Sequence, residues 1–185
     1  IGNSLQGTAV AVDYDAFLNG VKDVLEKKTT KVTAEAAQEI IQTAIADAQK
    51  KLGEDNLKKE TEFLAANGKK SEVKTTESGL QYQVIKEGTG KKPVATDTVK
   101  VDYVGKLLDG TQFDSSIERN EPAVFQVGGV IPGWAEAVQL MTVGSKYKVW
   151  IPSKLAYGEQ GAGGKVGPNA TLEFEIDLLS IEAAQ

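Results

Sequence analysis

The spacing of apolar residues changes near residue 78, from a helical period before it to strict alternation after it. Between Tyr14 and Leu25, apolar side chains recur at steps of three and four residues, which predicts an amphipathic helix. Asp13 precedes this segment and is a suitable N-cap, because its carboxylate can accept a hydrogen bond from an unpaired backbone N–H of the first turn. The polar stretch 27–31 breaks the pattern and is expected to be a loop.

A second helical segment follows Thr33, which is a plausible N-cap, and ends at Asn67-Gly68, a common helix stop. The pattern allows one long helix over 34–67 or two shorter helices that meet at a bend at Gly53. Its second half is too polar to be buried on all sides, so it can be an exposed connecting helix. It can also be a dimerisation element or an arm that lines a binding cleft. Because residues 1–52 hold more apolar surface than two helices can bury on each other, we expect them to pack against a second copy.

The second half of the chain has the pattern of a sheet. Alternating apolar residues predict strands over 80–84, 99–108, 124–127, 147–151 and 171–181. Asp109-Gly110 is a hairpin-type turn dipeptide, after which the chain resumes at Phe113. Helical spacing over 134–141 predicts one short helix. About five strands and one short helix indicate an antiparallel sheet with a helix on one face, an α+β fold.

Composition then removes several kinds of chemistry. The 185 residues include 21 basic and 26 acidic side chains, a net charge of −5, with no Cys and no His. Thiol catalysis, disulfides, His-dependent triads and most transition-metal sites are therefore excluded, and no cofactor is expected. The acidic balance and a single arginine, Arg119, argue against nucleic-acid binding.

The chain has no apolar run long enough to span a membrane. It begins at Ile1, and we expect it to be a fragment or a processed form.

Few polar residues remain as candidates for chemistry. Asp114, Glu118 and Glu121 are the acids nearest the aromatic-rich loops, and solvated loop positions are their simplest interpretation. Asp114 is the exception, because it follows Phe113 directly and one of the two should point inward, where a carboxylate needs a hydrogen bond or a ligand. The Gly-rich run 157–167 matches neither the Walker nor the dinucleotide-binding spacing and is expected to be a flexible surface loop.

A set of aromatic and aliphatic residues is the last candidate: Tyr103, Phe113, Phe125, Val130, Ile131, Trp134, Tyr157 and Phe174. The simplest interpretation is that they form core. Two features favour a pocket instead. Trp134 begins a helix directly after a turn, where a large ring can form the floor of a cavity. Tyr157 lies in a loop next to glycine, where its phenol is free to reach a ligand.

Four segments carry a resemblance to a known family: VDYVGKLLDGTQFDSS (101–116), FQVGGVIPGW (125–134), VGSKYKVWIPSKLAYGEQGAGG (143–164) and GPNATLEFEIDLL (167–179). In order and spacing, roughly residues 76–182 resemble the FK506-binding-protein family of peptidyl-prolyl cis/trans isomerases. The helical N-terminus resembles the bacterial two-domain branch typified by the macrophage infectivity potentiators. Residues 1–5 and 15–25 fit that branch's dimerisation region.

The resemblance implies a fold and a domain plan. The family fold is a curved antiparallel sheet wrapped around a short helix, with a proline pocket between them. It implies a helical dimerisation region with a long connecting helix over 1–67, a linker over 68–78 and an isomerase domain over 79–182.

The resemblance also assigns residues to the site. Those matched to the catalytic pocket are Tyr103, Phe113, Asp114, Trp134, Tyr157 and Phe174, and those matched to substrate binding are Phe125, Val130, Ile131, Ala123, Ala162 and Val166. Trp134 would lie under the proline ring, while the Ile131 N–H and the Tyr157 hydroxyl would bind ligand carbonyls. Ala123 stands where an aromatic wall residue is common, and Ala162 where a histidine is common. Both differences widen the pocket.

The implied activity is rotation about X-Pro bonds in unfolded or partly folded proteins, with chaperone activity. It needs no base, nucleophile, metal or cofactor. Macrolides of the FK506 and rapamycin type are implied ligands, and a homodimer is the implied assembly. The branch is mostly periplasmic or attached to the cell surface, with cytoplasmic members. The alternative is a non-catalytic chaperone that binds clients with its arms and dimer cleft.

Overall fold

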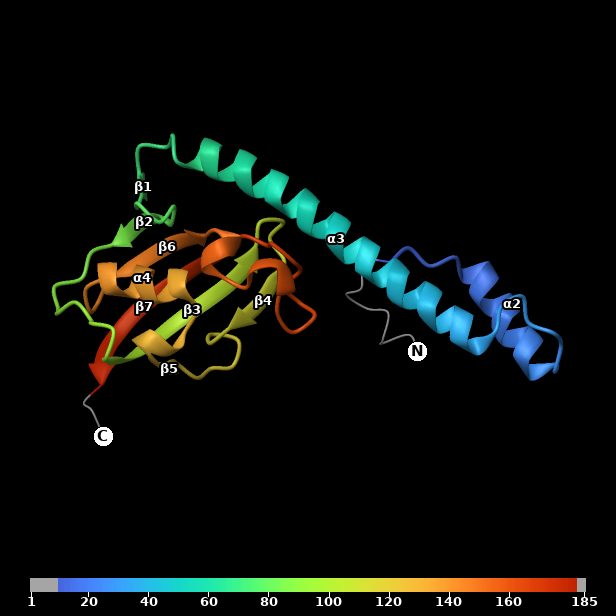
Figure 1. Ribbon diagram of the computed structural model, residues 1–185. Coiled ribbons are helices and arrows are strands. Elements are labelled where there is room, and N and C mark those ends of the chain that lie inside the picture. Colours follow the sequence, from blue (N-terminus) through green and yellow to red (C-terminus); the bar gives the residue numbers. More distant parts are fainter. Residues whose placement is uncertain (1–9, 183–185) are drawn as a thin grey trace. The chain divides into compact units, whose positions relative to one another are not determined.

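The computed structural model describes residues 10–182 (Figure 1). The chain forms two compact units that divide between Leu52 and Gly53. The boundary falls inside a helix, so each unit contains one part of it. The expectations for residues 1–5 lie outside the described residues.

The first unit contains helix α2 (Tyr14–Leu25) and the beginning of α3 (Ala34–Asn67). Both predicted caps are confirmed: the Asp13 carboxylate accepts from the Ala16 N–H at 3.0 Å, and the Thr33 hydroxyl accepts from the Ala36 N–H at 3.2 Å. The two alternatives for the second segment are also decided. α3 is one helix of 34 residues, and Gly53 lies within it as a buried residue.

The second unit is built on one antiparallel sheet. Its strands are β1 (Val73–Thr75), β2 (Gln81–Lys86), β3 (Thr98–Leu107), β4 (Gln112–Ser115), β5 (Ala123–Gln126), β6 (Lys146–Ile151) and β7 (Leu172–Glu182). Their order is β1-β2-β6-β7-β3-β4. β5 pairs with the first part of β3 and β4 with its last part, so both lie along the same edge. The α+β class predicted from the sequence is confirmed.

Within residues 10–182 the sheet has seven strands, and the prediction of about five was too low. The two additional strands are short. β1 has three residues, too few to show alternation, and pairs with β2 from within the expected linker 68–78. β4 is the segment resuming at Phe113, and its four residues pair with β3. Cross-strand hydrogen bonds define both, and a single sequence does not contain that information.

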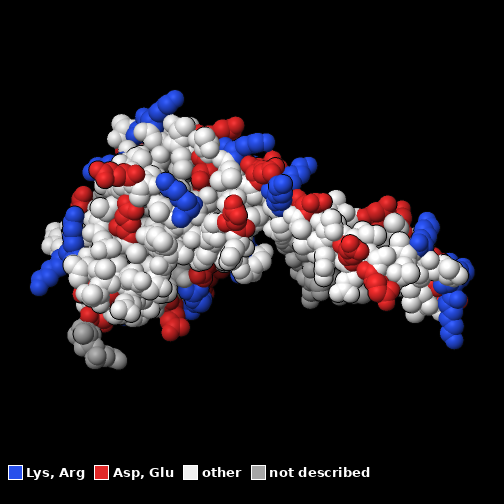
Figure 2. All heavy atoms as spheres, viewed as in Figure 1, with Lys and Arg blue, Asp and Glu red and all other residues white. Residues whose placement is uncertain are grey.

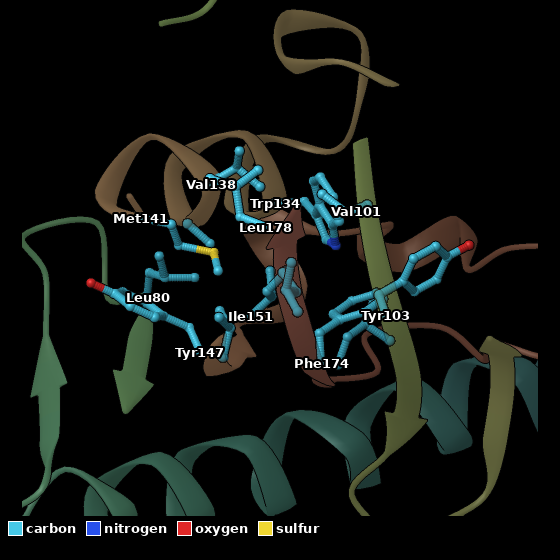
Figure 3. Packing of buried hydrophobic residues seen from close by; sticks show 14 of the residues in the cluster. Leu80, Val101, Tyr103, Trp134, Val138, Met141, Tyr147, Ile151, Phe174 and Leu178 are labelled. Atoms are coloured by element: carbon cyan, nitrogen blue, oxygen red, sulfur yellow. The ribbon is translucent and has the colours of Figure 1, made fainter. Parts of the chain in front are cut away.

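The core lies between one face of the sheet and helix α4 (Pro132–Leu140), and Figure 3 shows part of it. Along β3 and β7, alternate residues are buried as predicted, and Val101 faces Leu178 across the pair. Gly133 lets α4 approach β6 closely, since a Cβ there would lie only 2.3 Å from the Ile151 Cγ2. Pro132 occupies the first turn of α4, where its missing N–H costs nothing. Pro132 thus sets where α4 begins and Gly133 sets how close it lies to β6, and together they determine the position of Trp134.

The second half of α3 packs against β6 on the face of the sheet opposite to α4, because Trp150 and Ile151 are consecutive residues of the strand and point to opposite faces. The Phe63 ring lies 6.3 Å from the Trp150 ring. The Gln81 amide donates to the Leu64 carbonyl at 2.9 Å and accepts from the buried Asn67 side chain at 3.0 Å. These polar contacts fix the end of the helix against β2.

On the face of the molecule that Figure 2 shows, the described charged residues do not form a field of one sign. In the view of Figure 2, Lys and Arg are interspersed with Asp and Glu. Lys146 and Lys148, for example, each pair with acidic side chains of β7. Among residues 10–182, no helix combines the length and the apolar character needed to span a lipid bilayer.

Candidate active site

A pocket of about 400 Å³ opens at the end of α4, where β3, β4, β5 and β7 meet two loops. It is lined by Tyr103, Phe113, Asp114, Phe125, Gly129, Val130, Ile131, Trp134, Tyr157 and Phe174. Its wall is therefore largely aromatic and aliphatic, with one carboxylate and two phenols. Such a lining suits a small apolar ring that carries polar groups at its edge.

The floor of the pocket is an aromatic cluster centred on Trp134. Trp134 is 4% exposed, and its ring meets Tyr103 and Phe125 edge to face at 6.2 and 5.4 Å. Figure 3 shows Trp134 and Tyr103 at the same end of the core. Edge-to-face packing from two sides fixes the indole plane, so the ring presents a rigid surface rather than a mobile one.

A second wall depends on a residue without a side chain. Phe113 and Phe174 meet edge to face at 5.6 Å, and both rings lie over Gly105 of β3. A Cβ on Gly105 would lie 2.8 Å from a ring carbon of each phenylalanine. The close approach of the two rings to β3 therefore requires glycine at this position.

Asp114 is held at the rim by three partners. Its carboxylate accepts hydrogen bonds from the Tyr103 hydroxyl and from the Arg119 guanidinium, and the Ser115 N–H adds a third at 2.9 Å. Arg119 also donates to the Tyr103 hydroxyl at 3.0 Å, so the three side chains form a closed network. The sequence argument that an Asp beside Phe113 needs hydrogen bonds is confirmed.

This network sets the charges at the rim. Burial raises the pKa of the Asp114 carboxyl, but the hydrogen bonds from Tyr103 and Arg119 outweigh it and hold that pKa below its usual value. Burial, followed by the hydrogen bond to Asp114, raises the pKa of the Tyr103 phenol. At neutral pH the rim therefore carries an ionised carboxylate paired with arginine, beside a neutral phenol. None of these groups is poised to transfer a proton near pH 7.

Tyr157 belongs to the segment between β6 and β7. The 3-10 turns Ser153–Leu155 and Gly158–Gln160 flank it, and its side chain is 40% exposed. Within residues 10–182, its hydroxyl has no hydrogen-bond partner. A phenol that lines a pocket in this way can donate to a ligand.

Nine of the twelve predicted site residues line the pocket. Ala123, Ala162 and Val166 do not. Ala123 lies in β5 and packs against the core. Ala162 and Val166 are joined by two backbone hydrogen bonds of 2.8 and 3.0 Å, and Val166 is buried. Glu118 and Glu121 are exposed, as expected for loop residues.

Sequence reasoning missed three residues of this site: Gly105, Arg119 and Gly129. Arg119 offered a signal, since it is the only arginine and follows Asp114 by five residues. Gly105 offered none, because its contribution is the space that it leaves, and Gly129 offered none, because it lines the pocket with backbone atoms alone. Within the described part of the chain, no three His, Cys, Asp or Glu side chains gather closely enough to hold a metal ion.

Comparison with known proteins decides the family. Residues 89–179 match the model described as FKBP-type peptidyl-prolyl cis-trans isomerase. Residues 1–84 match the domain amino terminal to FKBP-type peptidyl-prolyl isomerase. The chain is 52% identical to the FKBP-type peptidyl-prolyl cis-trans isomerase FkpA of Aeromonas hydrophila, over 98% of this chain and 71% of that protein. The chain belongs to the FKBP-type peptidyl-prolyl cis-trans isomerases.

Further relatives extend this FKBP assignment over both units. Outer membrane protein MIP of Legionella longbeachae is 40% identical, over all of this chain and 82% of that protein. The crystal structure of FkpA from Escherichia coli superposes with a TM-score of 0.80 at 36% identity, covering 100% of this chain and 90% of that one. The resemblance stated from the sequence is therefore confirmed, and cis/trans isomerisation of X-Pro bonds is the activity of this protein.

Proposed function

We propose that the pocket around Trp134 holds the prolyl ring of a protein substrate and carries the isomerisation. The indole of Trp134 lies under the ring, and Phe113 and Phe174 form one wall. The observation that carries this proposal is the rigid aromatic floor, which Tyr103 and Phe125 hold from two sides.

Two polar groups orient the substrate. The Ile131 N–H and the Tyr157 hydroxyl each donate to a carbonyl of the bound peptide. In support, both residues line the pocket, and neither donor has a partner within residues 10–182. Asp114 holds the Tyr103 phenol in place and accepts from a polar group of the ligand. Val130 closes the side next to Ile131.

The chemistry follows from the amide bond. Rotation about X-Pro breaks resonance, and without catalysis it takes roughly tens to hundreds of seconds. In the twisted state the carbonyl loses polarity, so a dry aromatic pocket favours that state over the planar one. Selective binding of the twisted geometry raises the rate without any proton transfer. A barrier lowered by about 5–7 kcal/mol accelerates exchange roughly 10⁴–10⁵-fold. The rim groups Asp114, Arg119 and Tyr103 are consistent with catalysis of this kind, because none of them is poised to transfer a proton near pH 7.

The test is cis-to-trans exchange in a short X-Pro-Phe peptide, followed by NMR with and without the protein. The intact protein accelerates exchange, and a Tyr157→Phe, Asp114→Val double variant does so less. A Glu159→Gln variant, changed at an exposed side chain of the same loop, is the control and keeps full activity. No acceleration by the intact protein, or equal acceleration by the double variant, would refute these roles.

The first unit favours a second, associated function as a homodimeric chaperone. None of the twelve residues of α2 is buried, and its apolar side chains are largely exposed, among them Tyr14 at 76%, Leu18 at 62% and Leu25 at 78%. A groove of about 640 Å³ lies between α2 and the beginning of α3. A second copy of the chain would cover this surface. The dimer would then carry two pockets that can bind the same client, which would raise the avidity of the dimer for that client.

Light scattering at tens of micromolar tests the dimer. The expected mass is twice that of the chain, and Leu18→Glu, which places a charge on the apolar face, reduces it to the monomer. A monomeric mass for the unchanged protein would refute the dimer. Trp134→Ala separates the two activities: loss of isomerisation with client protection retained would establish an independent chaperone role.

Ligand preference and location complete the proposal. Macrolides of the FK506 and rapamycin type fill the same pocket, and the short side chains of Ala123 and Ala162, together with the inward-turned Val166, leave its entrance wide. Periplasmic or cell-surface location, with the cytoplasm as the alternative, rests on likeness to relatives such as outer membrane protein MIP. Titration with a macrolide and fractionation of the native cell test these two points.

A further inference from the structure

The segment between β6 and β7 carries Tyr157 and contains no α-helix and no strand of the sheet. It runs from Pro152 to Thr171 and contains two 3-10 turns and four glycines with positive φ. Short turns and glycines leave such a segment conformationally free. The position of Tyr157 over the pocket therefore depends on contacts between this segment and neighbouring elements.

The second half of α3 supplies that restraint through one carboxylate. Glu60 Oε2 accepts from the Ser153 N–H at 2.6 Å and from the Thr171 hydroxyl at 2.8 Å. Glu60 Oε1 accepts from the Ser153 hydroxyl at 3.2 Å. Ser153 and Thr171 lie at the two ends of the segment. A single side chain of the helix therefore clamps both ends together.

These partners are buried, which makes the clamp strong. Ser153 and Thr171 are each 3% exposed. Donors at such depth cannot turn to water when their acceptor is lost, so removal of Glu60 leaves them unpaired. Hydrogen bonds to an ionised acceptor are also about twice as strong as neutral ones.

A second contact extends the restraint toward Tyr157. The Asn56 amide, one turn before Glu60, donates to the Pro168 carbonyl at 2.8 Å. The next residue, Asn169, donates its N–H to the Gly158 carbonyl at 2.7 Å, and Gly158 follows Tyr157 directly. The helix is thus connected to the phenol through two hydrogen bonds and a short piece of backbone.

We infer that Glu60 is a positioning residue for the isomerase reaction: from the connecting helix α3, it holds the Tyr157 segment in the geometry that binds substrate. The inference rests on the proposed role of Tyr157. It gives the helix a part in catalysis besides that of a spacer between the two units.

The test compares Glu60→Ala with Glu60→Gln in the full chain. Alanine removes all three hydrogen bonds. Glutamine keeps them, because its amide oxygen can take the place of Oε2 while its NH₂ donates to the Ser153 hydroxyl. Glu62→Ala is the matched control, since Glu62 lies two residues further along the same helix and is exposed.

Two readouts separate positioning from simple stabilisation. Peptide exchange gives kcat/KM, which we expect to fall about tenfold in Glu60→Ala and to stay within about threefold of the unchanged protein in Glu60→Gln. Amide hydrogen exchange should accelerate at Ser153, Ala156 and Asn169 while the amides of β3 keep their protection. Glu62→Ala changes neither readout.

Several results would overturn the inference. These are full activity in Glu60→Ala, equal losses in the alanine and glutamine variants, or hydrogen exchange that rises equally across the sheet. If Glu60→Ala does not fold, Thr171→Val removes one donor at nearly constant shape. It should show smaller changes in the same direction, and no change in either readout would overturn the inference. Absence of activity in the unchanged protein would instead refute the proposed site.

Discussion

Gly105→Ala tests the aromatic wall of the pocket most directly, because it adds one methyl group at a defined place. The new Cβ would lie 2.8 Å from Phe113 Cζ and 2.8 Å from Phe174 Cε1, whereas ordinary contact begins at 3.4 Å. Both rings must therefore move by about 0.6 Å, the difference between these distances. They are packed edge to face at 5.6 Å, so neither can move without the other.

The size of the effect follows from this displacement. Overpacking of a filled core costs about 1–3 kcal/mol of unfolding free energy. A misplacement of 1 Å in an active site costs roughly a hundredfold in rate, so a shift of a little over half that distance should lower kcat/KM about tenfold. Urea denaturation measures the first quantity, and NMR exchange in an X-Pro-Phe peptide measures the second.

A double variant tests the cause. Phe113→Leu removes the ring carbon nearest to the new methyl group, so it should recover part of the stability that Gly105→Ala loses. Lys106→Ala, on the opposite face of β3, is the control for a change in the strand itself and leaves kcat/KM unaltered. Strict additivity of the Gly105 and Phe113 changes, or full activity in Gly105→Ala, would refute the reasoning.

Three further outcomes are expected. The folded pKa of Asp114 lies below its unfolded value, so its contribution to stability is present above about pH 4 and is lost as the pH falls through the folded pKa. The Asp114→Asn variant should therefore lose less stability than the unchanged protein when the pH falls from 5 to 2. The difference should be under about 1 kcal/mol, because the Asp114–Arg119 pair is half-exposed. Urea denaturation of both proteins across this pH range measures it, and parallel curves of stability against pH would contradict it. In Arg119→Lys, the ammonium group cannot bond Asp114 and Tyr103 together as the guanidinium does. This variant should therefore show a measurable fall in kcat/KM of up to about fivefold, and an unchanged kcat/KM would exclude a role for the network in catalysis. Gly133→Ala places a Cβ 2.3 Å from Ile151 Cγ2 and should cost at least about 1–3 kcal/mol, seen as a lower melting temperature, and an equal or higher one would refute the close packing of α4.

The sequence by itself determined the elements whose signal is periodic and local. Both ends of the helical segment over 34–67 were predicted, because Thr33 and Asn67-Gly68 mark them chemically, whereas the choice between one helix and two helices bent at Gly53 stayed open. The alternation in β3 and β7 fixed which residues face the core. Nine of the pocket residues could be named because they lie within the four segments that carry the family resemblance.

Only the tertiary structure decided the features that depend on contacts between distant segments. The short strands β1 and β4 exist because β2 and β3 pair with them. The closed network of Asp114, Tyr103 and Arg119, the empty space at Gly105 and the grip of Glu60 on residues 93 and 111 positions away are equally invisible in a linear pattern. Periodicity reports whether a side chain is buried, whereas its partner is chosen by the fold.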